Sequence, residues 1–318
     1  MMRLIRSEVS LFSNATQLME TVKKSAARPT RKLWLAAIKP PMYSVAIMPI
    51  WVGSAVAFAE TKTFHQEIFL TFVAAAILIL AWENLSNDVF DSETGVDVNK
   101  ANSLVNLTGN KPLIFWISNL CLALGLLGVG TIALWQQDFT VISLILLCCF
   151  LGYIYQGPPF RLSYQGMGEI LCFIAFGPLA FSAAYYSQTK SWSSTNLAAS
   201  IVIGIATSLI LFCSHFNQVN DDAAVGKKSP IVRLGSKRSA QLLPWLSGSI
   251  YGLTLLFVGL RLFPLWTLLI FASLPFAFKL CQVIGAHYHQ PEKLTYCRFI
   301  AVALHFWSGL LLGLGFIL

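Results

Sequence analysis

Two clusters of acidic and amide side chains are the residues of this sequence best suited to chemistry. Only 14 of the 318 residues are acidic. One cluster contains Asp88, Asp91, Glu93 and Asp97, and the other contains Asp221 and Asp222. Each cluster follows a long apolar stretch, so we expect each to lie where a helix leaves an apolar environment.

The first cluster has the spacing of a helix face. Asn84, then Asn87 or Asp88, then Asp91 recur every three or four residues and would share one face, and Gly95 predicts the helix end. Stacked carboxylates repel one another unless a cation lies between them. Oxygen ligands without His or Cys favour Mg²⁺ shared with a phosphate. The alternative is an acidic loop in solvent.

The second cluster pairs oxygen ligands with nearby cations. Asn217 with Asp221, or Gln218 with Asp222, has i, i+4 spacing. A metal bridging diphosphate oxygens, with Lys or Arg taking the remaining charge, suits this composition. His215 is a candidate for orienting a ligand or touching an acceptor, and the alternative is a structural histidine at the membrane interface. We assign Asn87, Asp88, Asp91, Asp221 and Asp222 to the metal, and Asp88, Asp91 and Asp222 to catalysis.

Further cations and aromatic residues complete the predicted site. The candidates for binding a diphosphate are Lys111, Arg161, Lys227, Lys228 and Arg233. Tyr153 and Tyr155 end an apolar stretch at the same side of the membrane. Aromatic faces stabilise cations, although tyrosines at a membrane boundary also form interfacial belts. The lysines and arginines also admit a simpler interpretation as loop charges or anchors of helix ends.

The composition indicates that lipid surrounds these sites. Hydrophobic residues make up 56% of the chain and charged residues 11%, against about 25% charged in soluble domains. About 20 helical residues cross a bilayer, which predicts spans near 41–59, 68–85, 113–134, 139–155, 170–186, 197–213, 242–260, 263–283 and 299–318. The fold prediction is all-α: a polytopic bundle of about nine transmembrane helices. Its two aspartate-rich motifs follow spans four apart, which indicates an internal repeat.

Positive charge predicts the orientation. If the loops alternate sides, one side holds 19 of the 22 lysines and arginines, and the positive-inside rule places that side in the cytoplasm or stroma. The net charge of +8 is thus a topological signal, and no nucleic-acid surface is indicated. Residues 1–32 form a basic polar tail, or a transit segment, before a transmembrane domain at 33–318. The seven cysteines indicate neither disulfides nor a zinc site.

At these motifs the sequence resembles the UbiA-type intramembrane aromatic prenyltransferases. The resemblance covers about residues 33–318 and rests on two motifs, Asn87-Asp88-x-x-Asp91-x-x-x-Gly95-x-Asp97 and Asp222-x-x-x-Gly226-Lys227. Where that family usually has another aspartate, four residues before Asp222, this chain has Gln218. The strings Tyr155–Glu169 and His215–Gly235 are similar to those of the phytyl-transferring group within the family.

The resemblance implies a Mg²⁺-dependent enzyme in which a ring carbon of an acceptor attacks a developing carbocation. The candidates that it suggests for contacting the acceptor or sheltering the carbocation are Lys39, Asn84, Tyr153, Tyr155, His215, Asn217 and Gln218. Its expected substrates are phytyl diphosphate and 1,4-dihydroxy-2-naphthoate, and its expected product is a phylloquinone precursor formed with loss of CO₂. It would act in a cyanobacterial inner or thylakoid membrane, or in a plastid membrane, and no obligate protein partner is predicted. The alternatives are homogentisate or chlorophyllide as acceptor, a secondary transporter or a membrane scaffold.

Overall fold

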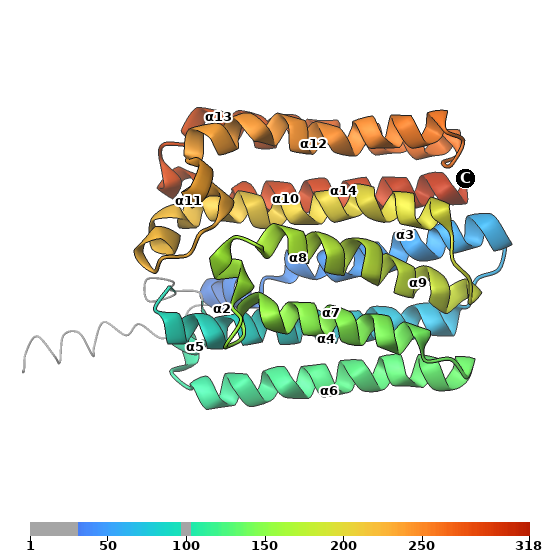
Figure 1. Ribbon diagram of the computed structural model, residues 1–318, viewed down its shortest axis with the longest axis horizontal. Helices are drawn as coiled ribbons and strands as arrows, with labels where there is room; N and C mark the ends of the chain where they lie inside the picture. The colour runs from blue at the N-terminus through green and yellow to red at the C-terminus, as the bar shows by residue number, and fades with distance from the viewer. Residues whose placement is uncertain (1–30, 97–102) are drawn as a thin grey trace, which may run out of the picture.

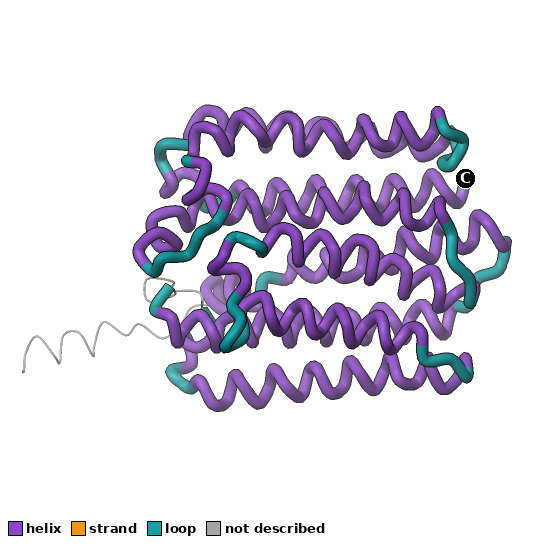
Figure 2. Tube along the Cα trace, viewed as in Figure 1, coloured by secondary structure: helices purple, strands orange, loops and turns teal. Residues whose placement is uncertain are grey.

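The apolar stretches fold into long helices that run side by side (Figures 1 and 2). The computed structural model describes residues 31–96 and 103–318, and in these ranges every regular element is helical. The long elements are α3 (Ser44–Thr61), α4 (Gln66–Thr94), α6 (Lys111–Gln136), α7 (Thr140–Gln156), α10 (Ser194–Ala224), α12 (Ser236–Gly259) and α14 (Cys297–Ile317). Short helices extend or connect them: α2 (Arg31–Ile38), η1 (Pro40–Tyr43), α5 (Leu104–Thr108), η2 (Leu162–Gln165), α11 (Pro230–Leu234) and η5 (Pro291–Leu294).

Two spans are composed of consecutive helical pieces. One joins α8 (Gly168–Ile174), η3 (Ala175–Leu179) and α9 (Ala180–Thr189), and the other joins η4 (Leu265–Ser273) to α13 (Leu274–His287). Among the described residues, eight helical segments are long and apolar enough to cross a membrane, and α7 is a shorter apolar helix. The prediction of an all-α bundle with about nine membrane helices is confirmed. The fifth and sixth spans are longer than the 17 residues expected, because helix continues past the apolar core at their ends.

The break in the fifth span has a local cause. Gly177 has non-helical torsion angles (φ −88°, ψ −109°) and precedes Pro178, which cannot donate a backbone hydrogen bond. A Cβ atom at Gly177 would lie 3.0 Å from the carbonyl oxygen of Ser200 and 3.2 Å from Cα of Gly204. Glycine at this position therefore allows the bent span to lie directly against α10.

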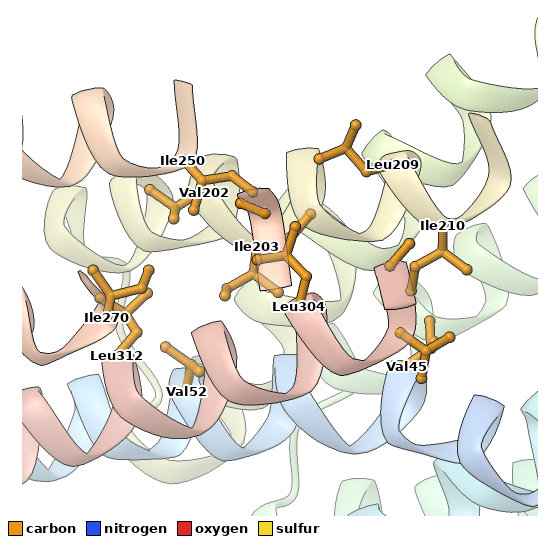
Figure 3. Close-up of a cluster of buried hydrophobic side chains, with 14 of the residues drawn as sticks. Val45, Val52, Val202, Ile203, Leu209, Ile210, Ile250, Ile270, Leu304 and Leu312 are labelled. Carbon is orange, nitrogen blue, oxygen red and sulfur yellow. The ribbon is translucent and has the colours of Figure 1, made fainter. Parts of the chain in front are cut away.

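Burial separates central helices from peripheral ones. In α10, 67% of the apolar window is buried, compared with 22% in α6. Figure 3 shows buried side chains of α3, α10 and α14, such as Val52, Ile203 and Leu304, meeting at the centre. The outer helices expose large apolar residues, including Trp116, Leu127, Trp245 and Phe278. In a polytopic membrane protein these residues face lipid.

The two ends of the bundle differ. Helices α2, α5 and α11 gather at one end, and the C-terminus lies at the other (Figure 1). Both acidic motifs are at the end with the short helices, because α4 and α10 each end there. The C-terminus therefore lies opposite the motifs, as an odd number of spans predicts. Residues 1–30 and Asp97 lie outside the described residues, and α2 already begins at Arg31 within the predicted tail. The division at residue 32 stays a prediction.

Candidate active site

A cavity of about 670 Å³ extends from the motif end into the bundle. This volume lies in the range that accommodates organic ligands. Its polar wall is formed by Asn84, Asn87 and Asp91 of α4 and by Asn217, Gln218, Asp221 and Asp222 of α10. Deeper, the lining is mainly apolar, with side chains such as Ile50, Phe72, Ile145, Phe176 and Ile210. The cavity can therefore hold a molecule with a charged head and an apolar body.

The first motif is positioned by the last turns of α4. The helix ends at Thr94, and Gly95 follows with φ 79°, which confirms the predicted stop because glycine adopts this conformation without steric cost. Asn84, Asn87 and Asp91 all line the cavity. Of the two alternatives at the middle position, the structure thus places Asn87 on the cavity face.

Asp88 is held by other groups. One carboxylate oxygen accepts a hydrogen bond from the backbone N–H of Leu104 at 2.8 Å, and the other lies 3.9 Å from Nζ of Lys39. The side chain of Asp88 is 1% exposed and does not belong to the cavity lining, whereas Lys39 does. Asp88 therefore lies beside the cavity and can position Lys39, whereas Asn87 and Asp91 line the cavity itself.

The second motif is held by a buried chain of charged groups. Oδ2 of Asp222 lies 2.8 Å from Nδ1 of His215, and Oδ1 lies 3.4 Å from Nζ of Lys227. The other ring nitrogen of His215 lies 3.5 Å from Oε1 of Glu169. A histidine held in this way fixes the orientation of the carboxylate that it binds. Of its two predicted roles, the geometry favours orienting a ligand.

Asn217, Gln218 and Asp221 also lie in the cavity wall. The side-chain oxygen of Asn217 accepts a hydrogen bond of 3.1 Å from the hydroxyl of Thr295, just before α14. Asp221 is part-buried, whereas Asp222 is buried. The second motif thus presents one carboxylate that is more open to the cavity and one that is fixed by its neighbours.

Tyr164 connects the two motifs. Its hydroxyl donates to Oδ1 of Asp91 at 3.1 Å, and its ring lies 5.4 Å from Nζ of Lys227. Burial and the charge of Asp91 raise the pKa of Tyr164, so the phenol stays protonated and remains a donor. Sequence reasoning missed this residue, although it lies between Arg161 and Glu169 in a segment that was singled out.

The five predicted diphosphate ligands occupy different surroundings. Lys227 lines the cavity. Nζ of Lys111 and Nη2 of Arg161 lie 2.8 and 3.0 Å from the two carboxylate oxygens of Glu93. Lys228 and Arg233 are exposed. Apart from Lys227, the structure does not bring these side chains into the cavity, because Glu93 binds two of them and two face outward.

The two predicted tyrosines have opposite orientations. Tyr155 lines the cavity. Tyr153 is half-exposed, packs edge-on against Phe90 and donates its hydroxyl to the carbonyl oxygen of Pro158 at 2.7 Å. Residues two positions apart on a helix project about 200° from each other. Tyr155 is therefore placed to contact a ligand, and Tyr153 is not.

Two charged residues in the cavity wall were not predicted. Arg298 projects from the first turn of α14, and Glu83 lies one turn before Asn87 on α4. Arg298 makes no ion pair with a carboxylate in residues 31–96 and 103–318. Glu83 belongs to the predicted span 68–85, and Arg298 immediately precedes the predicted span 299–318. An isolated ionisable residue within or next to an apolar span is the signal that could have identified both.

The donor set fits a hard divalent cation that shares its coordination sphere with a phosphate. Within the described ranges, three or more His, Cys, Asp or Glu side chains do not converge in a complete metal centre. The cavity wall instead offers amide and carboxylate oxygens from two facing helices. Mg²⁺ is usually bound by one or two carboxylates, with water and phosphate oxygens as the other ligands. The residues present suit that mode.

A cavity inside a bundle of apolar helices, with two oxygen-rich helix ends at its mouth, suits a substrate that joins a phosphorylated head to an apolar chain. The UbiA prenyltransferase family profile matches residues 46–310. The chain is 56% identical over 292 residues to the 2-carboxy-1,4-naphthoquinone phytyltransferase of Synechocystis, covering 92% of this chain and 95% of that one. It is 41% identical to the chloroplastic enzyme of the same name from Arabidopsis thaliana, covering 91% and 78%. The chain belongs to the UbiA prenyltransferase family.

Solved structures support the same architecture. A UbiA homolog from Archaeoglobus fulgidus superposes with a TM-score of 0.61 at 18% identity, covering 88% of this chain and 99% of that chain. A structure of the homolog bound to DMAPP and Mg²⁺ gives a TM-score of 0.55 at 16% identity, covering 88% and 98%. At these identities the likeness concerns the fold.

Proposed function

We propose that this membrane enzyme transfers a phytyl chain from its diphosphate to 1,4-dihydroxy-2-naphthoate, with loss of the carboxyl group as CO₂, in phylloquinone biosynthesis. The observation that carries the proposal is the pair of Asn/Asp helix ends at the mouth of one largely apolar cavity. The names and high identity of the Synechocystis and Arabidopsis relatives support the choice of substrates.

The charged head of the donor fits the motif end. Asn87, Asp91, Asp221 and Asp222 would hold Mg²⁺, which, when bound, neutralises the diphosphate leaving group. Lys39 and Lys227 line the same region of the cavity. Tyr164 and His215 keep Asp91 and Asp222 in position through their hydrogen bonds. These fixed groups stabilise negative charge where the allylic C–O bond breaks.

The apolar part of the cavity suits the remaining steps. The phytyl chain would lie along its aliphatic and aromatic walls, which exclude water from the reactive cation. Tyr155 presents an aromatic side chain there and can stabilise the developing positive charge. The attacking ring must be electron-rich, which favours the dihydroxy form of the acceptor over the quinone. Arg298 is available to bind the acceptor carboxylate through charge-assisted hydrogen bonds.

Acceptor choice is tested with isolated membranes. Membranes containing the protein receive phytyl diphosphate, Mg²⁺ and either 1,4-dihydroxy-2-naphthoate, homogentisate or chlorophyllide. We expect demethylphylloquinone to form with the naphthoate and little product to form with the other two. Faster prenylation of homogentisate or chlorophyllide would keep the family assignment and overturn this acceptor.

We further propose that the motif end faces the cytoplasm or stroma, in a cyanobacterial inner or thylakoid membrane or in a plastid membrane. The charge asymmetry of 19 to 3 supports this orientation. A cysteine at Ser236, at the start of α12, should react with an impermeant thiol reagent from that side only. Labelling from the opposite side would reverse the orientation. Lys100, a second position suited to this test, lies outside the described residues.

A further inference from the structure

Glu83 places a carboxylate in the cavity wall deeper than the metal motif. It belongs to α4, within a membrane span, and lines the cavity together with Tyr155 and Cys172. A Cβ atom at Gly152 of α7 would lie 3.9 Å from its carboxyl carbon. The carboxylate therefore projects between α4 and α7, toward the part of the cavity that receives the apolar portion of a ligand.

The described residues leave this carboxylate without a compensating charge. Its side chain lines the cavity, is part-buried, and forms no hydrogen bond or ion pair with residues 31–96 or 103–318. The nearby ionisable groups are Tyr155, Cys148, Cys149 and Cys172, none of them a cation. An ionisable group at membrane depth is costly and is typically retained for function. A structural role would require partners that Glu83 does not have.

Its position on α4 gives a distance from the diphosphate. Glu83, Asn87 and Asp91 all line the cavity with i, i+4, i+8 spacing, so Glu83 lies about 6 Å along the helix axis from Asn87. Atoms about to react are held about 3–3.5 Å apart. The allylic carbon of the donor lies next to the diphosphate, on the side of the cavity interior. If a ring carbon of the acceptor is held against that allylic carbon, the oxygen substituents of the ring lie at the depth of Glu83.

The chemistry of the substrates identifies the group that binds there. The phytyl chain offers no hydrogen-bond donor, and the carboxylate of an aromatic acid would be repelled by Glu83. A phenolic hydroxyl is a donor, and a charge-assisted hydrogen bond from it would increase electron density in the ring.

We propose that Glu83 accepts a hydrogen bond from a ring hydroxyl of the acceptor, which sets the depth and reactivity of the ring. This inference rests on the proposed prenyl transfer to a dihydroxy aromatic acid.

The test compares Glu83→Gln with the wild-type enzyme on three acceptors: 1,4-dihydroxy-2-naphthoate and its two mono-O-methyl ethers. We expect Glu83→Gln to lower kcat/KM for the dihydroxy acceptor at least about tenfold, with KM for phytyl diphosphate unchanged within about twofold. One ether lacks the hydroxyl that is proposed to bind Glu83, and wild type and variant should bind this ether equally well. Binding of the ethers is measured as an inhibition constant, so that turnover is not required. Equal losses on all three compounds, or a raised KM for phytyl diphosphate alone, would overturn the proposal.

Glu67→Gln is the matched control, because Glu67 is an exposed carboxylate in the first turn of the same helix; it should keep wild-type kinetics. The unfolding temperature of Glu83→Gln should match or exceed that of wild type, since the variant removes a part-buried negative charge with no cation beside it among the described residues. A marked loss of stability would indicate a structural role. If the wild-type enzyme prenylates homogentisate and not the naphthoate, the proposal that the naphthoate is the acceptor fails. Wild type and Glu83→Gln are then compared on homogentisate and its O-methyl ethers, and this comparison still decides the role of Glu83.

Discussion

The ends of α4 and α10 carry related motifs that are held in place by different means. In each, a buried aspartate lies near a lysine: Asp88 is 3.9 Å from Lys39, and Asp222 is 3.4 Å from Lys227. At α4, Asp88 also accepts a hydrogen bond from the N–H of Leu104 in α5, and Asp91 accepts one from the hydroxyl of Tyr164 in η2. At α10 the remaining contacts come from His215 and Glu169 inside membrane helices.

This difference indicates that the side chains of the two motifs are held in position to different degrees. The carboxylate of Asp222 at the α10 end is held through His215 and Glu169 of membrane helices, so this proposed metal ligand is fixed before a substrate binds. The α4 end is held by contacts from the short helices α5 and η2, which lie outside the long membrane helices. We therefore expect the α10 end to be sensitive to single substitutions in its buried charge chain, and the α4 end to depend on how its connecting segments dock.

The largest effects should come from Asp91→Asn and Asp222→Asn. Each removes one negative charge facing the proposed Mg²⁺–diphosphate complex, and a loss of several kcal/mol of transition-state stabilisation corresponds to about a thousandfold in turnover. Both variants should remain folded in the membrane by gel filtration. Wild-type activity of either purified variant at saturating Mg²⁺ would contradict the proposal that the substituted aspartate binds Mg²⁺.

Asp88→Asn serves as the internal comparison for that pair. Asp88 lies beside the cavity and contacts Lys39 and Leu104. Its substitution should therefore lower the unfolding temperature, and it should reduce turnover much less than Asp91→Asn does. A loss of turnover as large as that of Asp91→Asn would restore Asp88 as a direct ligand.

The next effect concerns His215. His215→Gln should weaken the apparent affinity for Mg²⁺ about 10- to 100-fold, the range seen when a group that orients a metal ligand is removed. The measurement is the Mg²⁺ dependence of turnover at saturating phytyl diphosphate. His65→Gln provides the control, because His65 is exposed and precedes α4 at the opposite end of the bundle. Equal Mg²⁺ dependence in both variants would remove the orienting role.

Tyr164→Phe tests the α4 end in the corresponding way. It removes the hydroxyl that donates to Asp91, a hydrogen bond whose net value of about 0.5–1.5 kcal/mol corresponds to roughly twofold to tenfold in Mg²⁺ affinity. The raised pKa of Tyr164 keeps the phenol protonated below pH 10. The ratio of wild type to variant should therefore stay constant between pH 6 and pH 9. A ratio that changes across that range would show that Tyr164 acts by losing its proton.

Much of the fold could be predicted from the sequence because lipid imposes a simple requirement. Membrane spans must be long and apolar, and hydrophobicity alone located the eight candidate spans of the described residues and the shorter apolar helix α7. Gly95 predicted where α4 ends, and the structure confirms it. The kink at Gly177 was not predicted, because it depends on how closely the bent span approaches Ser200 and Gly204 of α10.

The site could be predicted only in part, because helical spacing defines a face but not what lies opposite. Asn87 and Asp88 are adjacent, and the packing of α5 and Lys39 decides which of them faces the cavity. Glu93 binds both Lys111 and Arg161, a contact among three segments distant in sequence. Arg298 reaches the cavity because α14 packs beside α10, which no local pattern shows.

The smallest expected effect tests the remaining asymmetry between the two motifs. Gln218 lines the cavity one turn before Asp222, at a position where the family resemblance leads one to expect an aspartate. A neutral amide oxygen contributes less to a cation than a carboxylate does, so Gln218→Ala should weaken Mg²⁺ affinity only about twofold to fivefold. Gln218→Asp should instead tighten it, since the carboxylate adds a negative charge toward the metal. Both are measured by the Mg²⁺ dependence of turnover, with Asn119→Ala, on α6 and outside the cavity lining, as the control. If Gln218→Asp weakens Mg²⁺ binding, the α10 end already holds its full complement of charge in Asp221 and Asp222. In that case a neutral residue at position 218 would be a requirement of this site, because a third carboxylate would repel the other two more than it attracts the metal.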